Sequence, residues 1–172
     1  SYGSGYQVYV IRLTQWLDTV WTRTYGGSDW DFGYGICKTH DGGFVIVGET
    51  HSYGAGNADV YLIKINGQGD TLWTRTFGGA NKDIGYSVIE SSVDSTIVFA
   101  GVTHSFSDSL GNAYLAQLDG NGALIWAQEH GDRGHEYLTS IVEAKNKVVQ
   151  SYVAVGASDT ASDGDYKVYI LG

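Results

Sequence analysis

The chain has 172 residues and a formal net charge of -9, and 42% of its residues are hydrophobic while only 17% are charged. This composition excludes a disordered polar segment. The acidic balance, with ten Lys and Arg residues, disfavours nucleic acid as a partner because phosphate binding needs positive charge. No stretch reaches the ~18 to 20 apolar residues of a membrane-spanning helix, so we expect no membrane insertion. The single cysteine, Cys37, allows no internal disulfide, and we expect it to be a small buried hydrophobe.

One motif occurs three times and organises the chain. It reads WTRTYGG from residue 21, WTRTFGG from residue 73 and, in diverged form, WAQEHG from residue 126, and its glycines at positions 26, 78 and 131 are 52 and 53 residues apart. A period near 50 residues is typical of propellers and related arrays. We therefore expect a single repeat region over residues 1–172, with a partial unit at 1–27, complete units at 28–79 and 80–131, and an incomplete unit at 132–172.

Abundant glycine and aromatic residues, with no proline, indicate many short strands joined by glycine turns. Residues 8–13 and 44–49 are apolar on both faces, which predicts strands covered on both sides, whereas residues 20–25 alternate and predict a half-exposed strand. Asp41-Gly42-Gly43 marks a tight hairpin turn. In chain order the predicted strands are 8–13, 20–25, 32–39, 44–49, 60–65, 72–77, 84–90, 96–100, 113–118, 124–129, 137–143, 149–155 and 167–171.

Four antiparallel strands per period make one blade of a β-propeller. The expected fold is therefore all-β, with about three and a quarter propeller blades in this chain. Because propellers have roughly four to eight blades, we expect the ring to be completed by another copy of the chain, as a homo-oligomer and most simply a dimer, or by missing chain. The sequence begins within a repeat and contains no methionine, so we expect it to be processed, cut from something longer or incompletely read.

Short motifs recur within the repeat: WTRTFGG at 73–79, DIGYS at 83–87, DGGF at 41–44 and DVYLIK at 59–64. With these motifs the chain resembles the secreted and cell-surface β-propeller repeat proteins of bacteria and archaea. The resemblance covers nearly the whole chain. It implies an exported, extracellular or cell-surface propeller with a role in binding or scaffolding, and it implies no particular activity.

The long loops and the connections between blades are expected to share one face of the ring, and they carry the candidate binding residues. Trp30 breaks the repeat, since its equivalent is Lys82, which makes it the best candidate for a stacking contact with a ligand. Aromatic and imidazole groups together could bind a sugar or a peptide. The candidate ligand-binding residues are Trp30, His51, Tyr53, His104, Phe106 and His135.

Residues that recur once per repeat are interpreted first as structural. Trp21, Trp73 and Trp126 are expected to pack between neighbouring blades, and Asp31, Asp83 and Glu136 form a second recurring set. His51 and His104 occupy equivalent positions, so they are interpreted as hydrogen-bonding partners of nearby acids such as Asp31 or Asp83, with repeated ligand pockets or catalysis as alternatives.

Metal binding is not expected. Asp119-Gly120-Asn121-Gly122 is read as a hairpin turn, because the later ligands of a calcium loop do not follow it. Asp159, Asp163 and Asp165 are weak calcium candidates, since a solvated acidic loop explains them equally well.

The sequence contains no nucleophile elbow, zinc spacing or phosphate loop, so we expect no catalytic residue and no cofactor. The expected function is a non-enzymatic exported module for protein–protein assembly, adhesion or extracellular scaffolding, with itself, a protein or a glycan as partner. The alternatives are a lectin-like carbohydrate-binding propeller and, third, a fragment of a propeller enzyme.

Overall fold

The computed structural model describes residues 5–106, 110–131, 134–145, 150–159 and 166–171, which form antiparallel sheets of two to four strands and no helix. The prediction of an all-β, antiparallel fold is confirmed. Within these residues, no helix is long and apolar enough to cross a membrane. The strands are β1 (Val8–Leu13), β2 (Thr19–Tyr25), β3 (Asp31–Lys38), β4 (Phe44–Thr50), β5 (Asp59–Ile65), β6 (Thr71–Phe77), β7 (Asp83–Glu90), β8 (Ile97–Thr103), β9 (Asn112–Leu118), β10 (Leu124–His130), β11 (His135–Lys145), β12 (Gln150–Asp159) and β13 (Tyr166–Leu171).

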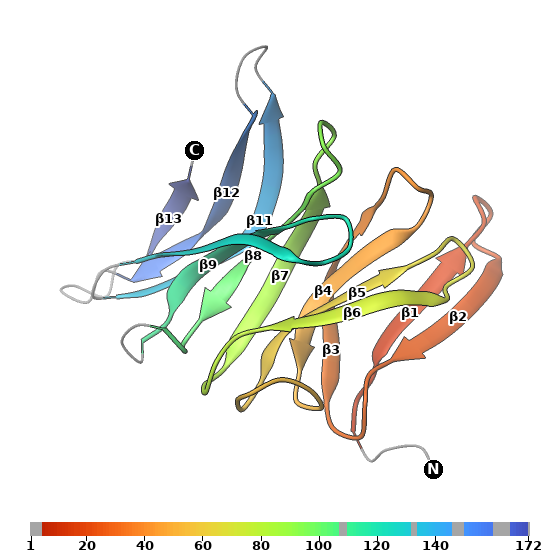
Figure 1. The fold of residues 1–172 in the computed structure, drawn as a ribbon, viewed down its shortest axis with the longest axis horizontal. Helices are drawn as coiled ribbons and strands as arrows, with labels where there is room; N and C mark the ends of the chain where they lie inside the picture. The colour runs from red at the N-terminus through yellow and green to blue at the C-terminus, as the bar shows by residue number, and fades with distance from the viewer. Residues whose placement is uncertain (1–4, 107–109, 132–133, 146–149, 160–165, 172) are drawn as a thin grey trace.

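The strands form four sheets in which chain neighbours pair. The first sheet is β1-β2, the second β3-β4-β5-β6, the third β7-β8-β9-β10 and the fourth β11-β12-β13. Figure 1 shows these sheets side by side in chain order, with β1 and β2 at one side and β11 to β13 at the other. β7 lies against β3, β4 and β5 of the second sheet, and β11 lies against β7, β8 and β9 of the third. Each sheet therefore packs mainly on its neighbours along the chain.

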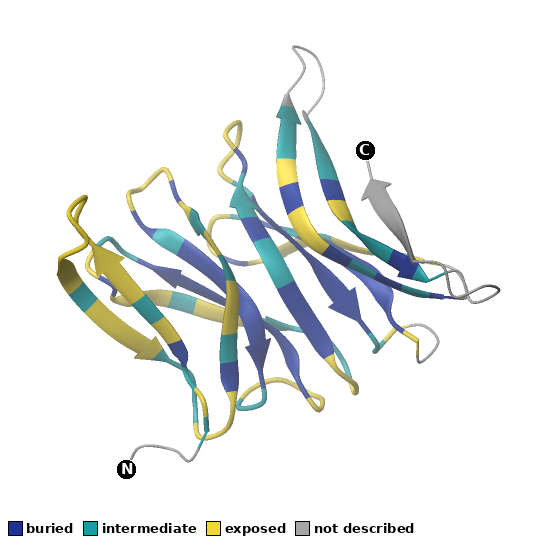
Figure 2. Cartoon of the chain, turned by 180° about the vertical axis from the view of Figure 1, so that it is seen from behind, coloured by how far each residue is buried: buried dark blue, intermediate teal, exposed yellow. Residues whose placement is uncertain are grey.

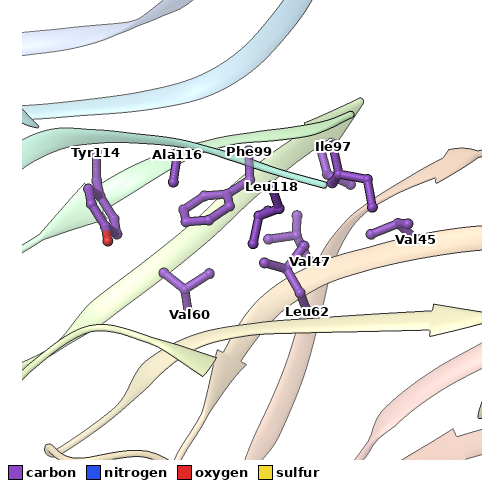
Figure 3. Packing of buried hydrophobic residues seen from close by; sticks show 10 residues of the cluster. Val45, Val47, Val60, Leu62, Ile97, Phe99, Tyr114, Ala116 and Leu118 are labelled. Carbon is purple, nitrogen blue, oxygen red and sulfur yellow. The ribbon is translucent and has the colours of Figure 1, made fainter. Parts of the chain in front are cut away.

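The core lies between the sheets, because their central strands are apolar on both faces. In β8, Ile97 and Phe99 pack toward the second sheet, whereas Val98 and Ala100 pack toward the fourth. Figure 3 shows Val45, Val47, Val60 and Leu62 of β4 and β5 facing a second group from β8 and β9, which includes Ile97, Phe99 and Leu118. A fully buried side chain such as Phe99 contributes about 1.5 to 3 kcal/mol relative to an exposed one.

Cys37 of β3 packs against the cluster between the second and third sheets. Burial raises the pKa of its thiol to about 11, so the group stays protonated at neutral pH. The thiol therefore behaves as a small apolar side chain, as expected from the sequence, but Cys37 is only partly buried.

The prediction that residues 8–13 are covered on both faces is wrong for β1. Val8 and Val10 pack on the second sheet, but Tyr9, Ile11 and Leu13 are 63%, 45% and 41% exposed. The reason is position: among the described residues β1 pairs only with β2, and no sheet covers its outer face. In β5, the equivalent strand of the second sheet, every residue is buried. Figure 2 shows the same contrast between the largely exposed first sheet and the buried strands beside it.

The other predictions about strand exposure are confirmed. Residues 45–50 of β4 are buried, whereas β2 is mostly exposed with Trp21 and Tyr25 half-buried. The outer strands β6 and β10 are also mostly exposed, with Trp73 and Trp126 half-buried.

The repeated tryptophan joins one sheet to the next. The Trp21 indole Nε1 donates to the Gly67 carbonyl at 3.3 Å, and Trp73 Nε1 donates to the Gly120 carbonyl at 3.2 Å, so each ring on an outer strand reaches the β-turn of the following sheet. Gly122, at φ 80°, lies under the Trp73 ring, where an added Cβ would come within 3.3 Å of it. We call this contact the Trp–turn joint.

An arginine covers each of these rings. The guanidinium of Arg23 lies 5.8 Å from the Trp21 ring centroid and that of Arg75 lies 5.6 Å from the Trp73 centroid. The third copy differs, because Trp126 Nε1 donates to Gln117 of its own sheet while its ring packs against the cluster between the third and fourth sheets.

Candidate functional site

One end of the second, third and fourth sheets gathers most of the candidate binding residues. Trp30, Lys82 and His135 occupy the same repeat position, directly before or at the start of β3, β7 and β11. Backbone bonds from His51 to the Trp30 carbonyl (2.8 Å) and from His104 to the Lys82 carbonyl (3.2 Å) hold the residues after β4 and β8 beside them. The rings of Trp30 and His51 are 6.1 Å apart and those of His104 and His135 are 5.7 Å apart. We call these five residues the strand-end row.

Glu49 of β4 contacts two members of this row, His51 and Lys82. Its side chain is only 4% exposed, and its partner Lys82, from the third sheet, is 48% exposed, with Nζ 3.1 Å from Oε2. The contact is an ion pair rather than an aligned hydrogen bond. Oε1 accepts from the Tyr34 hydroxyl at 3.2 Å and lies 3.8 Å from His51 Nε2. The carboxylate therefore links the second sheet to the third.

Two tyrosines extend the site along the first strands of these sheets. Tyr34 of β3 and Tyr86 of β7 are repeat equivalents, and their rings are 5.6 Å apart. Burial raises the pKa of both hydroxyls, and the nearby Glu49 carboxylate raises them further. Both hydroxyls therefore remain protonated at neutral pH and act as hydrogen-bond donors or acceptors.

Further aromatic rings continue from Tyr34 toward the start of the chain. Phe32 stacks on Tyr34 with ring centroids 6.3 Å apart, and Tyr6 lies 5.6 Å from Phe32 and 6.2 Å from Trp30. Tyr6, Trp30 and Tyr34 are exposed. The arrangement places aromatic faces beside a buried carboxylate and an accessible ammonium group, which can recognise polar ligands through hydrogen bonds and ring contacts.

The recurring acids lie beneath this row and are fully buried. Asp31 accepts hydrogen bonds from the backbone of Gly27 (2.7 Å) and from the hydroxyls of Ser52 (2.8 Å) and Thr50. These bonds close the loop that follows β4 onto the start of β3, which is a structural task.

The third sheet repeats the arrangement. Asp83 accepts from Gly79 (2.9 Å), Ser105 (2.6 Å) and Thr103. In the fourth sheet Glu136 takes this position, and its Oε1 accepts from Ser158 at 3.0 Å while Oε2 has no hydrogen-bond partner among the described residues.

The expected bonds between imidazoles and these acids are not formed. His51 lies near Glu49 instead, and the imidazole Nδ1 of His104 lies 2.8 Å from the Lys82 carbonyl, while only its backbone N–H reaches Asp83, at 3.1 Å. The reason is that serine and threonine hydroxyls of the same loops, being shorter and closer, already occupy the aspartate oxygens.

Tyr53 and Phe106 do not join the row. Tyr53 packs on Tyr61 of β5 with ring centroids 5.7 Å apart, and Phe106 packs on Tyr114 of β9 at 5.9 Å. The six candidate residues are thus divided between the strand-end row and two separate positions on the third strands of their sheets.

The described residues contain no group of three or more His, Cys, Asp or Glu side chains arranged to hold a metal ion. Of the weak calcium candidates, Asp159 is the last residue of β12, whereas Asp163 and Asp165 lie outside the described residues.

No protein-family model matches the chain, and no curated protein matches it either.

Glu49, Tyr34 and Tyr86 were not among the residues selected from the sequence. Glu49 could have been found, because it breaks the repeat: the equivalent residues are Val102 and Ala157. The criterion of departure from the repeat had selected Trp30, and it applies equally to Glu49 and to Lys82. No comparable signal exists for the two tyrosines, which keep the repeat and gain their interest only from the carboxylate beside them.

Proposed function

We propose that the four sheets are blades of an exported β-propeller, and that the chain acts as a non-enzymatic module for assembly, adhesion or scaffolding at the cell surface or outside the cell. In this proposal each four-stranded sheet is one blade, and the first and fourth sheets are parts of further blades. The ring would be completed by further units of the same repeat, from a second copy or from additional chain.

The observation that carries this proposal is a pair of uncovered apolar faces at opposite sides of the sheet series. On β1, Tyr9, Ile11 and Leu13 are exposed, whereas their equivalents on β5 are covered by the first sheet. On the fourth sheet, Val142 and Val155 are exposed. Their equivalents in the third sheet, Ile89 and Ala100, pack against the fourth.

The two faces are complementary because the repeat packs such faces against each other within the chain. The face equivalent to Tyr9, Ile11 and Leu13 is covered by the preceding sheet in the second and third sheets. The face equivalent to Val142 and Val155 is covered there by the following sheet. A second copy can therefore supply for each face the kind of sheet that covers it elsewhere, and association buries the apolar surface.

The mass of the chain in solution tests this self-association. We expect an oligomer, and we expect Ile11→Glu on one face and Val142→Glu on the other to dissociate it. Val20→Glu is the matched control, because the equivalent residue Leu72 is exposed even between neighbouring sheets. A stable, folded monomer of 18.6 kDa would refute assembly through copies of this chain.

A lectin-like role is the second candidate, and the strand-end row supports it. Trp30 is exposed and lies against His51 and Tyr6. His51 in turn lies 3.8 Å from the Glu49 carboxylate. An aromatic face beside polar groups suits a sugar ring, which has both apolar C–H faces and hydroxyls. Loss of glycan binding on Trp30→Ala would support this role, and silence of the chain on a glycan array would contradict it.

A further inference from the structure

A polar depression lies between the first and second sheets, and none of its lining residues belongs to the strand-end row. Its volume is about 400 Å³, and its wall contains six hydroxyl-bearing side chains: Thr24, Tyr25, Tyr53, Tyr61, Thr71 and Thr74. Gln7 and Gly26 complete the lining, so none of the lining residues carries a charge. For a chain with a net charge of -9, this is a neutral surface rich in hydrogen-bonding groups.

Hydrogen bonds to the backbone hold the aromatic walls in place. The Tyr53 hydroxyl donates to the Gly26 carbonyl at 3.0 Å and the Tyr25 hydroxyl donates to the Gly69 carbonyl at 2.6 Å. Tyr61 hydrogen-bonds with Thr74, and burial raises the pKa of the Tyr61 hydroxyl to about 12. The rings are therefore positioned before any ligand arrives, which lowers the entropy cost of binding.

The third sheet contains an equivalent depression with different chemistry. Its volume is about 320 Å³, and it is lined by Phe106, Tyr114, Leu124 and Ala127 together with Gln128 and Glu129. Each of the first four residues follows its counterpart, Tyr53, Tyr61, Thr71 or Thr74, by 53 positions.

At three of the four equivalent positions a hydroxyl in the first depression is replaced by an apolar group in the second. These substitutions lie in the lining of the depressions, whereas the tryptophan of the same strand is kept, as Trp73 in β6 and Trp126 in β10. The third sheet forms without these hydroxyls, so a sheet of this type can fold without them. In the second sheet the Tyr53 hydroxyl donates to the Gly26 carbonyl and Thr74 hydrogen-bonds with Tyr61, and these bonds fix polar groups around the depression where a ligand can reach them.

We propose that the depression between the first and second sheets binds one neutral saccharide unit. The threonine hydroxyls can exchange hydrogen bonds with sugar hydroxyls, and the exposed ring of Tyr53 offers a face to the sugar C–H groups. The absence of charge among the lining residues selects an uncharged sugar over a uronic or sialic acid. This inference rests on the carbohydrate-binding role, but it uses a site separate from Trp30.

Titration of the whole chain with a panel of sugars at millimolar concentration, followed by NMR, tests the site. The panel contains neutral hexoses and N-acetylhexosamines as free sugars and as methyl glycosides, together with glucuronic and sialic acid. Binding of the methyl glycosides indicates a unit within a glycan, and binding of only the reducing sugars indicates a free ligand. Either result supports the site, whereas no binding by any neutral sugar, or stronger binding by the acids, overturns it.

The variant Tyr53→Phe, Thr71→Leu, Thr74→Ala copies the lining of the third sheet into the second. We expect it to weaken the binding of a neutral sugar at least about tenfold, and Tyr53→Phe alone to weaken it a few-fold. If circular dichroism shows that the triple variant does not fold, the effect of Tyr53→Phe alone on sugar binding tests the site.

Trp30→Ala is the matched control, and it should leave this binding unchanged. Loss of binding with Trp30→Ala and not with the depression variants would overturn the site while keeping the carbohydrate-binding role. The mass of the chain in solution reports on assembly independently of both results.

Discussion

Replacing Glu49 by valine tests whether the buried carboxylate beside the strand-end row stabilises the fold or is present for binding. Valine is the residue that the third sheet carries at the same position, where Val102 is buried. The change therefore introduces a side chain that this type of sheet already accommodates. It removes the carboxylate from Tyr34 and Lys82, both of which remain accessible to water.

The size of the effect follows from the exposure of the partners. Burying a valine contributes about 1.5 to 3 kcal/mol. The losses are one hydrogen bond from Tyr34, about 1 kcal/mol, and an ion pair worth about 0.5 to 1 kcal/mol because the Lys82 side chain is 48% exposed. Buried ion pairs replaced by apolar residues are often neutral or stabilising. We expect Glu49→Val to raise the free energy of unfolding by about 0.5 kcal/mol and Tm by about 1 to 2 °C.

Urea unfolding followed by tryptophan fluorescence measures this change. Lys82→Ala is the companion variant, because it leaves the Glu49 carboxylate buried without its cation and should lower the free energy of unfolding by about 1 to 3 kcal/mol. If Glu49→Val instead destabilised the chain by more than about 1 kcal/mol, the ion pair would be structural. The expected result would show that Glu49 is kept at a cost in stability, which is typical of a binding residue.

Three further changes probe the Trp–turn joint, the buried acid Asp83 and the exposed acid Asp41. Gly122→Ala should lower the free energy of unfolding by about 2 to 4 kcal/mol, because the positive φ strains an alanine and the added Cβ lies close to the Trp73 ring. Gly42→Ala is the control, since Gly42 also has a positive φ but an added Cβ would have no atom within 4 Å. It should cost only about 1 kcal/mol in the same unfolding assay. Asp83→Asn should cost about 2 to 4 kcal/mol in thermal unfolding, since an amide cannot accept all the bonds of the buried carboxylate. Asp119→Asn at a half-buried turn position should cost much less, because one amide oxygen can accept both of its backbone hydrogen bonds. A hydrogen bond from the Thr39 hydroxyl, followed by the Gly43 N–H and Lys64, lowers the pKa of Asp41 to about 2. The stabilising effect of this carboxylate is therefore present above pH 4 and is lost as the pH falls from about 4 to 2. The difference in stability between the wild type and Asp41→Asn should shrink over that range, and a constant difference would contradict the assignment.

The strand pattern could be predicted from the sequence because two local signals agree. Glycine turns divide each period, and the central strands are apolar on both faces, as in residues 45–50. The strand ends were less accurate: β8 continues through Gly101 to Thr103, past the predicted end at residue 100, because it pairs with β7 and β9 on both sides. Tertiary pairing overrides the local effect of the glycine.

The exposure of β1 could not be predicted, because its sequence is nearly that of β5. VYVIRL and VYLIKI encode the same strand, and only the presence or absence of a neighbouring sheet decides whether Tyr9 or Tyr61 is buried. The pairing of Glu49 with Lys82 was equally inaccessible from spacing alone. It depends on the packing of the third sheet against the second, which brings together two residues 33 positions apart.

The Trp–turn joint is directional. In both instances the tryptophan belongs to the earlier sheet and the glycine turn to the later one, so a unit presents a donor side and a different acceptor side. Copies joined in this way meet head to tail and not through two identical patches. Such a contact either closes on itself or continues without end. A dimer built from it must form the joint twice, and a small change in the angle between sheets would convert a closed ring into a growing filament.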